Sequence, residues 1–233
     1  MVMGTGYNPR IVTENLVFCV DAANIRSYPK TGTTWTDLKG GNNGTFNNMD
    51  ASNFSDENGG VLNFDGTDDY VETASNVNIT GSADRTLCVW YYHNTRNVTN
   101  SNVVGYGVSG DGQIFDILSR YDSGYDRVIG HFYGAGFDTI SSLPSRSTTN
   151  YLGWNYACMT KKGTLVSVYA NGEFSNSGSF NLNTSNSTLK IGKATWNSIN
   201  NYNGKIASVH LYDRALTADE VRQNYLATKE RYA

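Results

Sequence analysis

The sequence predicts an all-β protein, an antiparallel β-sandwich with one short helix near its C-terminus. Runs of alternating apolar and polar residues, rich in β-branched and aromatic side chains, recur along the 233-residue chain and are typical of strands. Clusters of Gly, Asn, Asp and Ser separate these runs and mark turns. Helical crossovers are missing between the runs, so we expect the strands to pair antiparallel in two packed sheets.

The spacing of the runs predicts about ten to twelve strands. The first, Leu16–Val20, is mostly apolar, which suits a strand covered on both faces. The segments VLNF and YVET follow, on either side of the stretch FDGTDDY. The pair within WNYACMTKKGTLVSVYANGEF turns at KKGT and ends in Asn171-Gly172, where both residues tolerate positive φ. The strand-bearing segments after YVET are Thr86–His93, Gln113–Arg120, Arg127–Tyr133, Trp154–Phe174, Thr188–Lys193 and Gly204–Asp213.

A helix is expected over residues 217–230. Thr217 and Glu220 have the spacing of a capping box, in which each side chain accepts from the backbone N–H of the other residue. The helix is expected to dock on the sandwich through one stripe, made of Val221, Tyr225 and Thr228.

One domain is expected to span residues 1–233, with residues 1–14 as an N-terminal arm. The formal net charge of −3 and the absence of a basic run give no reason to expect a nucleic-acid partner. No apolar run approaches the ~18 residues that span a membrane, so no membrane partner is expected. The opening MVMGTGYNPR lacks a charged region followed by an apolar one, so no secretory signal is expected.

The three cysteines each lie inside an apolar, strand-like run, and their spacings match no zinc pattern. They are Cys19, Cys88 and Cys158. The favoured interpretation is that all three are small buried residues kept reduced, with a disulfide as the alternative.

The stretch FDGTDDY places three carboxylates in seven residues, and this cluster has three interpretations. The favoured one is a structural turn at Asp65-Gly66, the bend of a β-hairpin, with Asp68 and Asp69 pointing to opposite sides. An ion site is the second and catalysis the third. An EF-hand loop is excluded, because such a loop requires Gly and Glu where this chain has Tyr70 and Asn76. Core-facing positions around the turn are predicted at Leu62, Phe64 and Val71.

Four segments in the same order resemble the laminin-G-like jelly-roll family, part of the concanavalin A-like lectin and glucanase superfamily. The segments are Leu16–Asn48, LNFDGTDDYVE, WNYACMTKKGTLVSVYANGE and YNGKIASVHLYDRALTADEV. The resemblance implies two antiparallel sheets, one of them curved, and a concave face or rim loops that bind glycans.

The chain departs from the family's pattern at two kinds of site. The superfamily's hydrolases carry Glu-x-Asp-x-x-Glu or Glu-x-Asp-x-Glu on one strand, and no glutamate here begins such a run. We therefore expect the protein not to be an enzyme. Where relatives often carry an acidic residue in the closing strand, this chain has Ala207 and Ser208. No cofactor is expected, and a structural calcium ion stays open with Asp21 and Asp65 as its ligands.

Aromatic residues are the better indication of a binding site, because sugar rings stack on them while sugar hydroxyls bond to polar groups. The chain has 16 Tyr and 4 Trp, although sandwiches also bury such residues in their cores. The candidate ligand-binding residues are Trp196, Asn197 and Tyr202 in the segment ATWNSINNYN, Trp90 and Tyr92 on one strand face, and His131 and Tyr133 on another.

The two ends of the chain, GYNPRIVTENLVFCVDAANIRSYP and LYDRALTADEVRQNYLATKERY, also resemble virion structural proteins predicted in tailed phages of marine cyanobacteria. This resemblance implies a non-catalytic virion component, a decoration or tail-fibre adhesion module, located on the virion. Its partners would be host-surface carbohydrate, other virion proteins, or further copies of the chain in a homo-oligomer. A cell-surface or secreted glycan-binding module is the alternative, and a polysaccharide hydrolase or lyase is the third.

Overall fold

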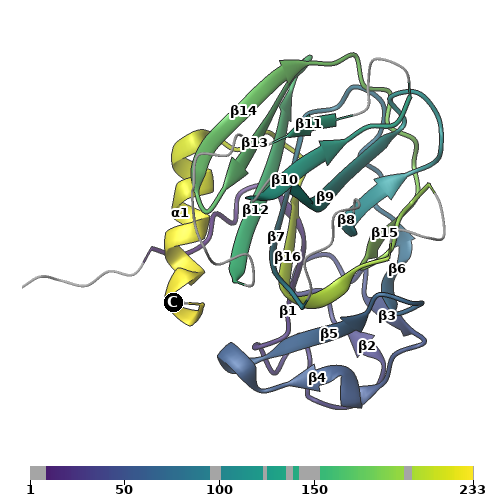
Figure 1. Cartoon of the computed structure of the whole chain (residues 1–233), viewed down its shortest axis with the longest axis vertical. Coiled ribbons are helices and arrows are strands. Elements are labelled where there is room, and N and C mark those ends of the chain that lie inside the picture. The colour runs from purple at the N-terminus through teal and green to yellow at the C-terminus, as the bar shows by residue number, and fades with distance from the viewer. Residues whose placement is uncertain are drawn as a thin grey trace, which may run out of the picture.

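The computed structural model describes residues 9–94, 101–122, 125–134, 139–141, 153–196 and 201–232. Two antiparallel sheets pack face to face, and one helix lies beside them (Figure 1). The predicted antiparallel β-sandwich with a short C-terminal helix is confirmed. We call the sheet that carries the helix the helix-side sheet and the other one the site-side sheet.

The helix-side sheet is centred on β7 and β16, and β1 and β5 follow one another along the same edge of β16. Its spatial order is β14 (Glu173–Ser179), β13 (Leu165–Ala170), β12 (Trp154–Lys162), β7 (Arg85–His93), β16 (Asn203–Tyr212), β5 (Val61–Asp65) and β4 (Phe54–Ser55), with β1 (Leu16–Asp21) also on β16.

The site-side sheet joins strands that are far apart in the sequence. Its spatial order is β11 (Thr139–Ser141), β10 (Tyr125–His131), β9 (Ile114–Asp122), β8 (Ser101–Gly107), β15 (Thr188–Ile191), β6 (Tyr70–Asn76), β3 (Gly44–Asn47) and β2 (Thr34–Trp35). The helical elements are η1 (Ala51–Asn53), η2 (Glu57–Gly59), α1 (Ala218–Thr228) and η3 (Lys229–Arg231).

The described residues contain sixteen strands rather than the expected ten to twelve. The additional strands include β2, β4 and β11, of two or three residues each, which are too short to show a two-residue period.

The stretch FDGTDDY corrects a second prediction. It is a corner between the two sheets and not a hairpin, because β5 pairs with β4 and β16 while β6 pairs with β3 and β15. A hairpin and a corner give the same alternation of apolar and polar residues, since in both cases one face of each strand lies in the core.

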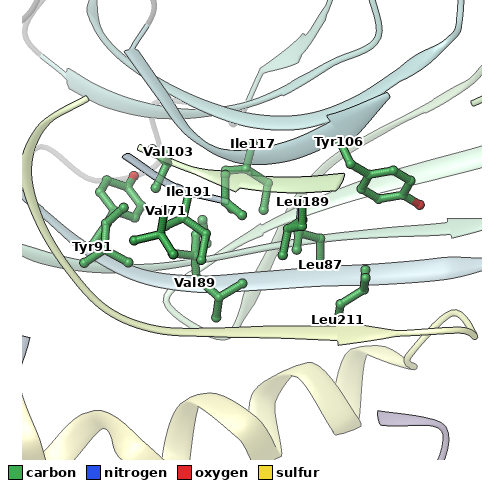
Figure 2. Packing of buried hydrophobic residues seen from close by; sticks show 14 of the residues in the cluster. Val71, Leu87, Val89, Tyr91, Val103, Tyr106, Ile117, Leu189, Ile191 and Leu211 are labelled. Carbon is green, nitrogen blue, oxygen red and sulfur yellow. The ribbon is translucent and has the colours of Figure 1, made fainter. Parts of the chain in front are cut away.

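One apolar core fills the space between the sheets. Figure 2 shows side chains from β7 and β16 meeting side chains from the site-side sheet, with α1 on the far side of β16. The predicted core positions Leu62, Phe64 and Val71 are at most 1% exposed and belong to this cluster. Because strand side chains alternate, the neighbouring residues of each strand face outward on either sheet.

The helix docks on the outer face of the helix-side sheet as predicted. The capping box of Thr217 and Glu220 is present. Val221 is fully buried, the Tyr225 ring stacks on Trp90 with centroids 5.7 Å apart, and the Thr228 hydroxyl accepts from Trp90 Nε1 at 2.8 Å. The α-helix ends at Thr228 and continues as η3, whereas the sequence predicts a helix to residue 230. No helix among the described residues is long and apolar enough to cross a membrane.

The described part of the expected N-terminal arm, residues 9–14, does not extend away from the sandwich. Val12 is buried, its N–H donates to Asn224 Oδ1 at 2.7 Å, and its carbonyl accepts from the Tyr212 hydroxyl at 2.9 Å. Residues 9–14 and the C-terminal segment therefore pack together over the helix-side sheet. Residues 1–8 lie outside the described residues, and the prediction of a single domain over the whole chain stays a prediction.

A row of buried residues crosses the helix-side sheet beneath these two ends. The register places Cys19, His210, Cys88 and Cys158 opposite one another on β1, β16, β7 and β12. All three cysteines are buried, which confirms that part of the prediction. Burial lowers the pKa of His210 to about 4; Asp21 opposes this shift and Arg231 adds to it.

His210 makes folding stability depend on pH. The unfolded chain protonates this histidine below its ordinary pKa of 6.5, whereas the folded chain resists protonation down to about 4. The free energy of unfolding is expected to fall as pH drops from 6.5 to 4, by at most about 3 kcal/mol. Urea denaturation of the wild type and His210→Gln across this range measures the effect, and the variant's curve is expected to be flatter. If the free energy of unfolding changes equally with pH in the wild type and the variant, the prediction is contradicted.

Candidate functional site

A polar row crosses the outer face of the site-side sheet. The register sets Lys190 of β15 opposite Gly105 of β8, Gly105 opposite Asp116 of β9, and Asp116 opposite His131 of β10. The residues on either side of Asp116 belong to the apolar core. Alternation therefore directs the Asp116 carboxylate away from the core, onto the outer face.

The Asp116 carboxylate is fully buried although it lies on the outer face. Its Oδ2 atom accepts hydrogen bonds from Asn102 Nδ2 at 2.8 Å and from the Thr195 hydroxyl at 2.9 Å. His131 Nδ1 lies 3.7 Å from the same oxygen, too far for a hydrogen bond but close enough for electrostatic attraction. Strands β8 and β10 and the segment that follows β15 thus converge on one carboxylate of β9.

Gly105 makes room for this carboxylate. A Cβ atom on Gly105 would lie 1.7 Å from Asp116 Oδ1 and 2.7 Å from the Asp116 Cα. No side chain larger than hydrogen fits there, because part of the obstruction is backbone. The glycine on β8 therefore sets the position of the acid on β9.

Burial raises the pKa of the Asp116 carboxyl, and contacts with His131, Thr195 and Asn102 act in the opposite direction. Burial has the larger effect, so the carboxylate form is disfavoured in the folded protein. The site therefore keeps an acid whose charge is costly, which is typical of functional positions but also occurs in structural networks.

Two aromatic rings contact His131, the neighbour of this acid. The Trp196 and Tyr133 side chains are partly exposed, and their ring centroids are 6.2 Å apart. His131 lies between them and the acid, with its ring 5.1 Å from Trp196 and 6.3 Å from Tyr133. Tyr133 has a left-handed backbone with φ of 61°, which is rare for a bulky residue and turns the chain at the end of β10.

Four polar atoms of this cluster are buried and have no hydrogen-bond partner among the described residues. They are Asp116 Oδ1, Asn102 Oδ1, His131 Nδ1 and Trp196 Nε1. An unpaired buried polar atom costs about 1–3 kcal/mol. Two of these atoms accept and the indole N–H donates, so the set matches a group that does both, such as a hydroxyl.

The structure brings together three of the predicted ligand-binding residues, Trp196, His131 and Tyr133, and separates the others from them. Trp90 is 2% exposed, because its ring is covered by Tyr225 and Tyr232 from the C-terminal segment. The prediction that Trp90 offers a free ring to a ligand is therefore wrong.

Tyr92 and Tyr202 also lie away from the Asp116 cluster. Tyr92 is on the outer face of the helix-side sheet, with its ring 5.6 Å from Trp154 and beneath the Lys205 ammonium. Tyr202 is fully buried in the core and donates its hydroxyl to the Tyr92 carbonyl at 2.8 Å. The prediction of Tyr202 as a loop aromatic open to ligand is wrong, since it joins the core at the start of β16. Asn197 lies outside the described residues.

The two predicted calcium ligands do not meet. Asp21 is held by both terminal nitrogens of Arg231, at 2.9 and 3.1 Å. Asp21 lies opposite Ser208 and Asp65 opposite Asn203 on β16, so they are about 16 Å apart along that strand. A shared calcium site at Asp21 and Asp65 is excluded by this separation.

Among the described residues, one group of carboxylates could hold a cation. The ligand atoms of Asp65, Asp68 and Asp69 lie within 4.8 Å of one another. Burial raises the pKa of Asp69, and the neighbouring Asp65 charge adds to the effect, while Asp69 Oδ2 accepts from Asn53 Nδ2 at 3.0 Å. The Asp65 carboxylate accepts from the N–H groups of Thr67 and Asp68, so it also stabilises the corner as a turn.

Sequence reasoning missed Asp116, Asn102, Thr195 and Gly105. One signal was present: Asp116 is a single acid in the otherwise apolar run Ile114–Leu118, and a charge there is rarely buried without a reason. The other three carry no such signal, because their role depends on which strands become neighbours.

A comparison with protein families matches residues 65–222 to the family Laminin_G_3, described as "Concanavalin A-like lectin/glucanases superfamily". These residues include most strands of both sheets and the first half of α1. No curated protein sequence matches the chain.

Solved structures of the same fold include sugar complexes. A Trypanosoma rangeli sialidase in complex with sialic acid is 17% identical, with a TM-score of 0.66 over 100% of this chain and 36% of that one. Domain 4 of AbnA, a GH43 extracellular arabinanase from Geobacillus stearothermophilus, in complex with arabinotriose, is 15% identical, with a TM-score of 0.65 over 91% and 98%. The binding domain of Paraclostridial Mosquitocidal Protein 1 is 18% identical, with a TM-score of 0.64 over 91% and 52%. At these identities the similarity establishes a lectin-like fold.

Substitution of Gly105 is expected to disrupt the cluster. Gly105→Ala forces a methyl group into the Asp116 carboxylate and backbone, so the free energy of unfolding should fall by about 1–3 kcal/mol or more. Gly163→Ala is the control: it has open space and a φ of +59°, so only backbone strain of about 1 kcal/mol is expected. Urea denaturation compares the two, and equal losses would contradict the steric role of Gly105.

Neutralising Asp116 is expected to increase stability at neutral pH. Its raised pKa means that ionisation costs stability as pH rises above the unfolded value of 3.8. Asp116→Asn keeps the shape and an acceptor oxygen but carries no charge. The variant should be more stable than the wild type at pH 7, with a difference that shrinks toward pH 3. Thermal melts at both pH values measure this, and a variant less stable at pH 7 would refute it.

Proposed function

Since the chain belongs to the Laminin_G_3 family of the concanavalin A-like lectin/glucanases superfamily, we propose that it binds carbohydrate on the outer face of its site-side sheet and cleaves no bond. One observation carries the proposal. The partly exposed rings of Trp196 and Tyr133 contact His131, which borders a cluster of buried polar atoms without partners among the described residues. Sugar recognition combines these two kinds of contact.

The chemistry of binding follows from the geometry. The apolar C–H face of a pyranose or furanose ring packs on the rings of Trp196 and Tyr133. The oxygens of Asp116 and Asn102 and the Trp196 N–H are buried in the unliganded fold, so the sugar hydroxyls bond to them only when the partly exposed rings shift to admit the ligand. His131 holds the acid and the indole in place, since it lies within electrostatic range of the first and in ring contact with the second.

The spacing of the acids supports a role without catalysis. On the polar row, the other carboxylate is Glu72, which lies opposite Lys190 and so three strand spacings, about 14 Å, from Asp116. Glycosidases that use two carboxylates hold them about 5–9.5 Å apart. The pair on this row is too widely spaced to act on one glycosidic bond.

The neighbours of known structure support a carbohydrate ligand. The arabinanase domain, almost all of which is covered by this chain, was solved with arabinotriose, and the sialidase with sialic acid. The chain spans about a third of the sialidase, so the activity of that whole enzyme gives no support for activity here. A single lectin-like domain is the part that they share.

The finer proposal is that the protein is a structural component of a tailed-phage virion and contacts host-surface glycans. It rests on the resemblance of the two chain ends to virion proteins. The described parts of those ends pack together over the helix-side sheet, on the opposite side of the sandwich from the Asp116 cluster. One face could thus attach to a particle while the other binds sugar, and many copies would convert weak sites into avidity. A cell-surface or secreted module is the alternative location.

A glycan array tests carbohydrate binding. The wild type should bind a defined set of glycans, and Trp196→Ala should weaken the binding at least tenfold, about 1.4 kcal/mol, because the stacking surface is lost. Phe174→Ala is the matched control, since Phe174 is 56% exposed on β14 of the other sheet. Binding by the wild type that survives Trp196→Ala would place the site elsewhere, and no binding on a broad array would refute the proposal.

Two further measurements separate the alternatives. Incubation with polysaccharides that bind should release no reducing ends or unsaturated products, and release would favour the hydrolase or lyase. Mass spectrometry of purified phage particles should detect this polypeptide if the virion proposal is right. Its presence on cells with no particles would favour the cell-surface alternative.

A further inference from the structure

The outer face of the helix-side sheet contains a pair of cysteines that the binding function does not use. We propose that Cys88 and Cys158 are a disulfide-forming pair, which closes under oxidising conditions to cross-link the neighbouring strands β7 and β12. The inference is independent of the proposed carbohydrate site, which lies on the other sheet.

The register brings these two cysteines together. Cys88 and Cys158 are directly opposite one another in an antiparallel pair, and their Sγ atoms are 2.7 Å apart. Residues facing one another in this way have Cα atoms about 4.5–5.5 Å apart, within the 4.4–6.8 Å of disulfides. Bond formation therefore needs side-chain adjustment of less than about an ångström, without movement of the strands.

The third cysteine provides an internal comparison. Cys19 lies opposite His210, and His210 lies opposite Cys88, so β16 separates Cys19 from the pair. Two strand spacings amount to about 10 Å, beyond the reach of a disulfide. Among the described residues no third metal-ligating side chain clusters with this pair, so the two sulfurs lack the ligand set of a structural metal site.

The reaction needs an oxidant, and a small-molecule disulfide such as oxidised glutathione supplies it. One cysteine thiolate attacks a sulfur of the oxidant, which forms a mixed disulfide and releases one glutathione thiolate. The second cysteine thiolate then attacks the protein sulfur and releases the second glutathione. Two protein thiols lose two electrons and two protons, and one oxidised glutathione becomes two reduced molecules.

Burial controls when this reaction can occur. Both cysteines are fully buried beneath the C-terminal segment, in a cluster that includes Tyr156, Leu216 and Val221. Burial and the neighbouring Cys88 raise the pKa of the Cys158 thiol, so little reactive thiolate exists while the C-terminal segment covers the pair. The pair should therefore close during folding or when α1 opens, and once closed it should resist reduction.

The bond would enclose the segment from Cys88 to Cys158, which contains β8, β9, β10 and β11. These strands carry Asn102, Gly105, Asp116 and His131. A cross-link that closes a loop of this length restricts the unfolded chain and is expected to raise the stability of the folded one. Because the two sheets share one core, the added stability would extend to the whole site-side sheet.

Thiol counting tests the proposal on the full chain. The protein is refolded in a buffer of oxidised and reduced glutathione, unfolded, alkylated with iodoacetamide, and digested without reduction. We expect one alkylated cysteine, Cys19, and a peptide linked through Cys88 and Cys158. Three alkylated cysteines, or glutathione adducts without the linked peptide, would overturn the proposal.

Single-cysteine variants identify which thiols form the link. Cys19→Ser should leave no free thiol and keep the link, whereas Cys88→Ser should leave two free thiols and no link. Where Cys88→Ser fails to fold, the wild type treated with a phosphine reductant takes its place: it should melt at a lower temperature than the oxidised protein. Equal melting temperatures together with three free thiols in both samples would reject the cross-link.

Discussion

The constraint on which the rest of the molecule depends is that two sheets share one apolar core. Every strand must direct alternate side chains inward, so the intervening residues face outward by geometry. On the helix-side sheet the outward residues around Cys88 and Trp90 are covered by the C-terminal segment, and Val12 packs in the same cluster. On the site-side sheet the outward row carries Asp116 and His131, so the two outer faces differ in their chemistry.

Aromatic residues have different roles on the two faces. Trp90 is covered by Tyr225 and Tyr232, and its indole N–H is satisfied by Thr228, so it holds the helix in place. Trp196 contacts His131 and Tyr133 and keeps an indole N–H without a partner among the described residues. The same residue type serves packing in one place and is suited to a ligand in the other, because only one of the two has its polar atom satisfied.

The site-side sheet concentrates groups whose burial is costly. Asp116 is ionisable and fully buried, and it is held by Asn102 and Thr195 from two other segments, with Gly105 giving it space. Such a cluster is less stable than an apolar patch would be, since unpaired polar atoms and a desolvated acid both raise the free energy of the folded state. A requirement for specific polar contacts at this face is a physical reason for a sequence to keep it.

The sequence by itself determined the sandwich, the capped C-terminal helix and the core positions Leu62, Phe64 and Val71, because alternation, capping and turn chemistry are local properties. It also indicated Trp196, His131 and Tyr133 through their type and setting. Only the tertiary structure decided that FDGTDDY is a corner between sheets, that Tyr202 belongs to the core, and that Asp116 lies at the centre of the candidate site. These outcomes depend on which strands become neighbours, and strand pairing joins residues that are far apart in sequence.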